Sequence, residues 1–139
     1  MKAIIVAAGS GTRLMSFTKD KPKCMLEVGG KTILQAILET LRENGINDIA
    51  VVKGYKKDMI NYPNVRYYYN PNYTESNILT SLFCAEREMK DGFIFSYSDI
   101  LINASIVQKL LQSRGDITLV VDTNWAPKYK PCMFSLMVH

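Results

Sequence analysis

The chain has 139 residues, of which 47% are hydrophobic and 22% are charged, and its net charge at neutral pH is +4. This composition is typical of one globular domain with a single core, and no second domain is needed. Because the basic residues are spread among acidic ones and form no arginine-rich tract, no nucleic-acid partner is expected.

The first predicted element is a short buried strand at residues 3–8, which runs directly into a glycine-rich loop. An apolar run of this length is too short for a signal sequence or a membrane span, so no membrane partner is expected. Gly9 and Gly11 let the chain turn sharply and bring backbone N–H groups close to a bound group. Thr12 and Arg13 add a hydroxyl and a guanidinium group, a combination that suits phosphate.

Strand-like and helix-like segments then alternate along the chain. A helix is predicted over residues 32–44, with an inward face made of Ile33, Ala36, Ile37, Thr40 and Leu41. The other predicted segments are strands at 48–53, 64–69, 92–97 and 117–121 and helices at 74–89 and 103–113. This alternation predicts an α/β fold in which helices cover both faces of a mostly parallel sheet.

The expected strand order is that of a doubly wound sheet, 3-2-1-4-5, in which the first and fourth predicted strands are neighbours. Ligands of such sheets bind beyond the carboxyl ends of the strands, where the winding reverses. Here those ends carry the glycine loop and Asp99, so a carboxylate is expected opposite a phosphate cradle, as where Mg²⁺ is bridged to phosphate oxygens. The alternative for Asp99 is a turn residue or a helix N-terminal residue.

Two common glycine-loop motifs do not fit this chain. The dinucleotide fingerprint requires a third glycine where the chain has Leu14, which argues against a dinucleotide-binding fragment. The Walker-type loop is not matched either, because residues 29–32 have too little between their glycines and predict a tight turn before a helix.

A third pattern fits in order and spacing. It consists of Gly9-Ser10-Gly11-Thr12-Arg13-Leu14, followed by Thr18, Pro22-Lys23, Val28, Lys31 and Leu34. This pattern resembles the signature of the nucleotidyltransferases that load sugar 1-phosphates, phosphocholine or phosphonates onto a nucleotide. Ser16 and Thr32 stand at positions where that family commonly has proline.

The segment at residues 70–82, N-P-N-Y-T-E-S-N-I-L-T-S-L, resembles the phosphocholine and aminoethylphosphonate cytidylyltransferase branch, where it helps to form the nucleotide pocket. Asn77 and Ser81 are four residues apart on one helical face, which suits hydrogen bonds to a base or ribose. The alternative for Ser76 and Asn77 is helix capping. Gly54, at the end of the second predicted strand, either approaches a nucleobase or is structural.

The resemblance implies a Rossmann-like three-layer α/β/α nucleotidyltransferase fold and a Mg²⁺-dependent reaction. An oxygen of a phosphate or phosphonate acceptor attacks the α-phosphorus of CTP or another nucleoside triphosphate, and pyrophosphate leaves. Arg13 and Lys23 are implied as catalytic residues and Asp99 as the metal ligand. The expected nucleotide-binding residues are Ala7, Ala8, Gly9, Ser10, Gly11, Thr12, Gly54, Asn77 and Ser81.

The resemblance covers residues 1–125, which are predicted to be the N-terminal nucleotide-binding portion of a single nucleotidyltransferase domain. Residues 126–139 are predicted to be a divergent or truncated tail, so the C-terminal part of the fold is expected to be missing. Two functions stay open. The chain is either an enzyme that transfers CMP to phosphocholine, aminoethylphosphonate or a sugar 1-phosphate, or a catalytically incomplete nucleotide-binding module whose open sheet edge allows self-association.

Two residue types limit the chemistry and the compartment. The only histidine is the last residue, His139, so an internal histidine base is excluded. The three cysteines, Cys24, Cys84 and Cys132, are widely separated and odd in number, which argues against a disulfide framework or a zinc knuckle. A reducing cytoplasm is the expected location.

Overall fold

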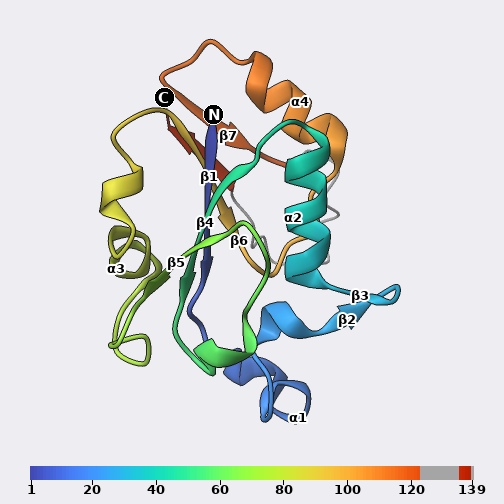
Figure 1. The fold of residues 1–139 in the computed structure, drawn as a ribbon, viewed down its shortest axis with the longest axis vertical. Coiled ribbons are helices and arrows are strands. Elements are labelled where there is room, and N and C mark those ends of the chain that lie inside the picture. Colours follow the sequence, from blue (N-terminus) through green and yellow to red (C-terminus); the bar gives the residue numbers. More distant parts are fainter. Residues whose placement is uncertain (123–134, 139) are drawn as a thin grey trace.

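The computed structural model describes residues 1–122 and 135–138, so Trp125, Cys132 and His139 lie outside it. The predicted division at residue 125 also falls outside the described residues and stays a prediction. Within them, helices cover both faces of a sheet with the order β5-β4-β1-β6-β8-β7 (Figure 1). The strands are β1 Lys2–Ala7, β4 Asp48–Lys53, β5 Arg66–Tyr69, β6 Phe93–Tyr97, β7 Ile117–Val120 and β8 Ser135–Val138. The predicted three-layer α/β fold is confirmed.

The four strands that carry the predicted winding are parallel, and the first and fourth predicted strands, β1 and β6, are neighbours as expected. The fifth predicted strand, β7, is not adjacent to β6. Instead β8 lies between them and pairs antiparallel with both, with Ile94 opposite Met137 and Thr118 opposite Met137. The short apolar segment of β8 satisfies the backbone groups of two strands at once, a pairing that its sequence alone did not predict.

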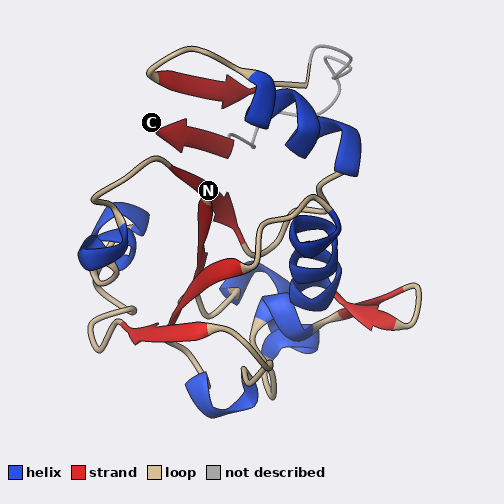
Figure 2. Cartoon of the chain, turned by 45° about the horizontal axis from the view of Figure 1, so that its top comes forward, coloured by secondary structure: helices blue, strands red, loops and turns tan. Residues whose placement is uncertain are grey.

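The core lies on both faces of β1, because alternate residues of a strand point to opposite sides. Ala3 and Ile5 face α2 (Ile33–Glu43) and α4 (Ala104–Gln112), whereas Ile4 and Val6 face the side covered by α3 (Ile78–Phe83). Figures 1 and 2 show α2 and α4 on one side of the sheet and α3 on the other. The strand is therefore buried on both faces, as its continuous apolar sequence predicts.

Two of the three predicted helices are confirmed. Thr32 caps α2 by accepting a hydrogen bond from the Gln35 N–H at 3.1 Å, and Asn103 caps α4 in the same way. The predicted inward face of α2 was partly wrong. The fully buried residues of this helix are Leu34, Ile37, Leu38 and Leu41, so the buried stripe is rotated relative to the predicted one.

The helix predicted over residues 74–89 is shorter and broken. Before α3, the N–H groups of Glu75 and Ser76 both donate to the carbonyl of Asn72, which forms a turn instead of a helical start. After α3, Ala85 N–H donates to the Leu82 carbonyl at 2.9 Å and the chain continues as a 3₁₀ turn at Glu86–Glu88. Hydrogen bonds between residues three apart thus replace those between residues four apart, and the α-helix ends early.

Shorter elements complete the fold. The helix α1 spans Met15–Thr18, and 3₁₀ turns lie at Thr12–Leu14, Lys23–Met25 and Lys57–Met59. The strands β2 (Glu27–Val28) and β3 (Lys31–Thr32) form the predicted tight turn before α2. Gly29 and Gly30, both with positive φ, make the two-residue loop. No helix in the described residues is both long and apolar enough to cross a membrane.

A buried charge cluster holds the amino ends of the strands together. Glu88, only 7% exposed, accepts hydrogen bonds from Arg66, from the Tyr68 hydroxyl at 2.6 Å and from Lys2 at 3.1 Å. Arg66 also pairs with Asp48. The hydrogen bonds from Arg66, opposed by desolvation and joined by those from Tyr68 and Lys2, lower the pKa of Glu88 to about 2.

We therefore predict that Glu88→Gln lowers the free energy of unfolding at pH 7 by about 2 kcal/mol, a value discounted because the Arg66 side chain is half exposed and screened by water. Because the folded-state pKa is depressed, the carboxylate stabilises the fold above pH 4–5, and this contribution is lost as the pH falls toward 2. Urea unfolding at pH 7 and pH 3 measures the effect. The difference between Glu88→Gln and the parent should shrink at pH 3, and an equal difference at both values would contradict it.

Gly54, which follows β4, fits where a side chain would not. A Cβ atom at this position would lie 2.5 Å from the Ala8 carbonyl oxygen and 2.7 Å from the Tyr73 Cβ. The Tyr55 N–H donates to the same Ala8 carbonyl at 3.0 Å. Gly54 thus lets three segments meet at the carboxyl ends of the strands, namely the end of β4, the loop after β1 and the loop that carries Tyr73.

Gly54→Ala is predicted to lower the free energy of unfolding by about 1–3 kcal/mol, because the added Cβ would overlap backbone atoms of Ala8, which must then move. Gly9→Ala is the matched control, since a Cβ at Gly9 would meet nothing within 4 Å. Thermal unfolding of both variants measures the difference. Equal melting temperatures for the two would show that the close approach at Gly54 carries no constraint.

Candidate functional site

The loop that follows β1 is held in place by its own backbone and by one buried hydroxyl. Gly11 has φ +65°, a conformation that favours glycine, and Leu14 N–H donates to its carbonyl at 2.9 Å. The Thr18 hydroxyl, buried below the loop, donates to the carbonyls of Gly11 at 2.9 Å and Leu14 at 3.2 Å. These bonds fix the loop from beneath.

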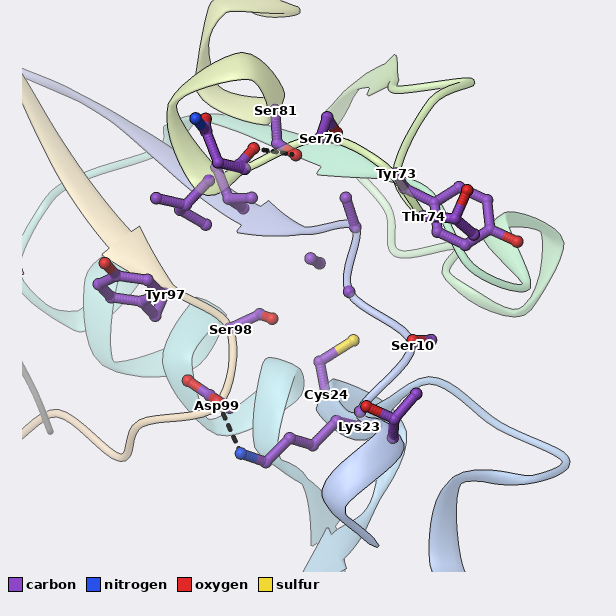
Figure 3. A pocket seen from close by; sticks show the side chains of 18 of the residues that line it. Ser10, Lys23, Cys24, Tyr73, Thr74, Ser76, Ser81, Tyr97, Ser98 and Asp99 are labelled. Atoms are coloured by element: carbon purple, nitrogen blue, oxygen red, sulfur yellow. Dashed lines mark hydrogen bonds and ion pairs between the residues drawn. The ribbon is translucent and has the colours of Figure 1, made fainter. Parts of the chain in front are cut away.

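A pocket of about 650 Å³ opens between this loop, the end of β6 and the start of α3 (Figure 3). It lies at the carboxyl ends of β1 and β6, where the winding of the sheet predicts a ligand site. Its lining consists of residues 6–14, Lys23, Cys24, Tyr73, Thr74, residues 76–78, Ser81 and residues 97–99. A space of this size admits a ligand as large as a nucleotide.

An ion pair crosses one end of the pocket. Lys23 Nζ lies 2.7 Å from Asp99 Oδ2, and both side chains are a little over one-third exposed. Figure 3 shows the two side chains pointing toward each other at the end opposite Ser76 and Ser81. The sequence predicted a carboxylate opposite the glycine loop, and the structure brings Asp99 into the same pocket as Gly11 and Arg13. The roles of these residues toward a ligand stay predictions.

The opposite wall is formed by residues 73–81. Asn77 caps α3, since its Oδ1 accepts from the Thr80 N–H at 2.9 Å, so the capping alternative is confirmed. Ser81 is buried, and its Oγ accepts from Asn70 Nδ2 at 2.8 Å. Both residues line the pocket as expected, although each already makes a hydrogen bond within the protein.

The structure brings together nearly all the predicted site residues. Those that line the pocket are Ala7, Ala8, Gly9, Ser10, Gly11, Thr12, Arg13, Lys23, Asn77, Ser81 and Asp99. Gly54 is the exception, because it packs behind Ala8 and Tyr73 and does not belong to the lining. Arg13 is exposed and makes no ion pair within residues 1–122 and 135–138, which leaves its guanidinium group available to a ligand.

Nine lining residues were not predicted as site residues, and three of them are Cys24, Ser76 and Ser98. The signal for two of them was adjacency, since Cys24 follows Lys23 and Ser98 precedes Asp99. Burial raises the pKa of the Cys24 thiol to about 12, and the nearby Asp99 carboxylate adds to the increase. Cys24 is therefore a neutral thiol and not a nucleophile at physiological pH.

Comparisons with known proteins agree with this geometry. A sequence profile of the MobA-like NTP transferase domain matches residues 3–136. The chain is 42% identical over 136 residues to the CTP:phosphoglutamine cytidylyltransferase of Campylobacter jejuni, covering 90% of this chain and 54% of the relative. It is 35% identical over 98 residues to the 2-aminoethylphosphonate cytidylyltransferase of Lancefieldella rimae, covering 67% of this chain and 40% of that protein.

The fold has solved counterparts as well. The structure of the CTP:phosphocholine cytidylyltransferase from Streptococcus pneumoniae superposes with a TM-score of 0.67 at 36% identity, covering 70% of this chain and 44% of that one. The chain spans about half the length of the curated relatives that it matches. The glycine loop and a polar wall surround one pocket. Because the family profile also matches most of its length, the chain belongs to the MobA-like NTP transferase family.

Proposed function

We propose that the chain is the nucleotide-binding part of a nucleotidyltransferase that transfers CMP from CTP to a small phosphorylated or phosphonate acceptor. The observation that carries this proposal is the Lys23–Asp99 ion pair, because it sets a cation and a carboxylate beside the glycine loop in one pocket. Support for CTP comes from relatives whose names specify CTP or cytidylyl transfer. Acceptors consistent with them are phosphocholine, aminoethylphosphonate and, by the wider family, sugar 1-phosphates.

The reaction needs no nucleophile from the protein. An oxygen of the acceptor phosphate or phosphonate forms a bond to the α-phosphorus of CTP, and the bond from that phosphorus to the bridging oxygen breaks and releases pyrophosphate. Two anions must therefore meet, and their repulsion is the barrier that the pocket has to lower. The neutral thiol of Cys24 fits a site where positioning and charge, and not covalent catalysis, do the chemistry.

Arg13 would bind the outer phosphates of CTP, because a guanidinium group donates to two phosphate oxygens at once. Lys23 would bind the phosphates of donor and acceptor where they meet. Backbone N–H groups of residues 9–11 would line the triphosphate, which requires the sharp turn that Gly11 permits. The hydroxyl of Thr18 would keep the loop in this shape without touching the ligand.

Mg²⁺ fits the residues present. Asp99 offers a partly exposed carboxylate oxygen at the end of the pocket, a ligand type that Mg²⁺ prefers. Within the described residues no three acidic, cysteine or histidine side chains gather that would hold a metal by themselves. Phosphate oxygens and water would complete the coordination, as is usual for Mg²⁺ bound with nucleotides. When bound, the ion would neutralise charge on the triphosphate.

The second candidate function is a nucleotide-binding module that uses the same pocket to bind a nucleotide without turnover. Pyrophosphate release measured with CTP, Mg²⁺ and each acceptor separates the two functions. Mg²⁺-dependent CTP binding without pyrophosphate would support the module, and absence of CTP binding would contradict both. The cysteine pattern favours the cytoplasm as the location of either.

Arg13→Ala is predicted to weaken Mg²⁺·CTP binding by about 10- to 100-fold, the usual loss for a hydrogen bond to a charged group. Calorimetric titration measures it, and circular dichroism should be unchanged because Arg13 is exposed. The matched control is Arg114→Ala, an exposed arginine outside the pocket, which should bind as the parent does. In the pyrophosphate assay Arg13→Ala and Lys23→Ala should each lose most activity, and near-normal rates in both would remove their proposed roles.

Asp99→Asn is predicted to strengthen the binding of metal-free CTP by up to about fivefold, because it releases Lys23 from an exposed ion pair. The same variant should lose the increase in affinity that Mg²⁺ gives the parent. Titrations of CTP in EDTA and in Mg²⁺ measure both effects. Glu39→Gln, which releases Lys31 outside the pocket, is the control. A variant that binds metal-free CTP more weakly than the parent would contradict the competition for Lys23.

A further inference from the structure

Asn70 is a buried polar residue next to the pocket that has no role in the proposed reaction. It follows the end of β5, is only 1% exposed and does not line the pocket. Its backbone N–H donates to the Lys53 carbonyl at 2.9 Å, which fixes the residue against β4. Its side chain, in contrast, bonds only to the segment that forms the pocket wall at residues 73–81 or leads into it.

The orientation of the Asn70 carboxamide follows from its partners. Oδ1 accepts a hydrogen bond from the Asn72 backbone N–H at 2.9 Å, and a backbone N–H can only donate. The other end of the carboxamide is therefore the NH₂ group, which donates to Ser76 Oγ at 2.7 Å and to Ser81 Oγ at 2.8 Å. Both protons of the amide are used, so the two serine oxygens are acceptors in these bonds.

This orientation leaves the serine protons to bond elsewhere. Ser81 donates its proton to the Asn77 carbonyl at 3.3 Å. The Ser76 hydroxyl has no further hydrogen-bond partner in the part of the chain that the structure describes, and Ser76 lines the pocket beside Ser81, as Figure 3 shows. The hydroxyl proton of Ser76 is thus the one that remains to be donated into the pocket.

Asn77 adds a second donor to the same wall. Its Oδ1 accepts from both the N–H and the hydroxyl of Thr80, at 2.9 and 3.2 Å. A carbonyl oxygen has two lone pairs, so this acceptor is used up and the NH₂ group of Asn77 is left for a ligand. The wall therefore offers donors to whatever binds against it.

We propose that Asn70 is a positioning residue that orients the Ser76 hydroxyl as a donor, and that Ser76 and Asn77 together read the base of the nucleotide. Cytosine presents two neighbouring acceptors, its N3 and O2 atoms, whereas uracil carries a proton on N3. Hydrogen-bond donors on the pocket wall pair with the N3 and O2 atoms of cytosine. With uracil in the same place, one of these donors faces the N3–H group, which is also a donor. A donor that faces another donor disfavours the wrong ligand, because neither group then has a hydrogen-bond partner. The inference rests on the proposed nucleotide site and deepens it.

The test is the ratio of CTP to UTP affinity, measured by calorimetric titration in Mg²⁺. Ser76→Ala removes the donor and should weaken CTP binding by about tenfold, with a smaller loss for UTP, so the ratio falls toward one. Asn70→Asp keeps the shape of the side chain but replaces the NH₂ donor by an acceptor, so both serine protons turn inward to it. This variant should lose the same preference although Ser76 is intact.

Ser105→Ala is the matched control, because Ser105 bonds to an asparagine, Asn103, at the start of a helix outside the pocket. It should leave the ratio unchanged. If the buried charge of Asn70→Asp prevents folding, Ser76→Ala alone decides the outcome, since Ser76 is only partly buried. Parent protein that binds CTP and UTP equally, or Ser76→Ala that weakens both by the same factor, would overturn the reading of the base but leave the proposed function standing. A parent that binds neither nucleotide would overturn both.

Discussion

The pairing of β1 with β6 is the constraint on which the site depends. The two strands run parallel in register from Lys2 opposite Phe93 to Val6 opposite Tyr97. Two residues further along, the chain has reached Ala8 on one strand and Asp99 on the other. Because parallel strands end at the same edge of a sheet, residues about 90 positions apart in the sequence are brought together there. The register thus carries the Asp99 carboxylate to the glycine loop.

The two ends of this sheet use charge in opposite ways. At the amino ends, Glu88 is buried and all its partners lie within the protein, so its charge contributes to folding. At the carboxyl ends, the Lys23–Asp99 pair is partly exposed, and an exposed pair contributes only about 0–1 kcal/mol. A pair of that strength is broken by a ligand that offers stronger partners to either member. Pairing between a cation and a carboxylate therefore makes a stable contact at one end and an exchangeable contact at the other.

Local sequence patterns were sufficient to predict most of the fold and the glycine loop after β1. The apolar run of β1 and the glycines after it predicted a buried strand and a sharp turn, and both are present. Of the predictions that failed, one has a local cause and one depends on distant strands. The helix expected over residues 74–89 starts late because Asn72 and Asn77 hold the chain in turns, and β8 has a place only because β6 and β7 leave one open.

Contacts between separate segments explain why the sequence did not predict Asn70 as a structural support of the site and left two roles open for Gly54. Neither touches the pocket, and each acts through a contact with another segment, Asn70 through two serines and Gly54 through the backbone of Ala8. The predicted residues that line the pocket belong to motifs with recognisable spacing. The residues that hold them belong to the packing beneath, where a single carboxamide can decide which hydroxyl protons are free. Specificity in such a pocket is therefore set one layer below the surface that the ligand touches, because the orientation of a hydroxyl depends on the partner that it already has.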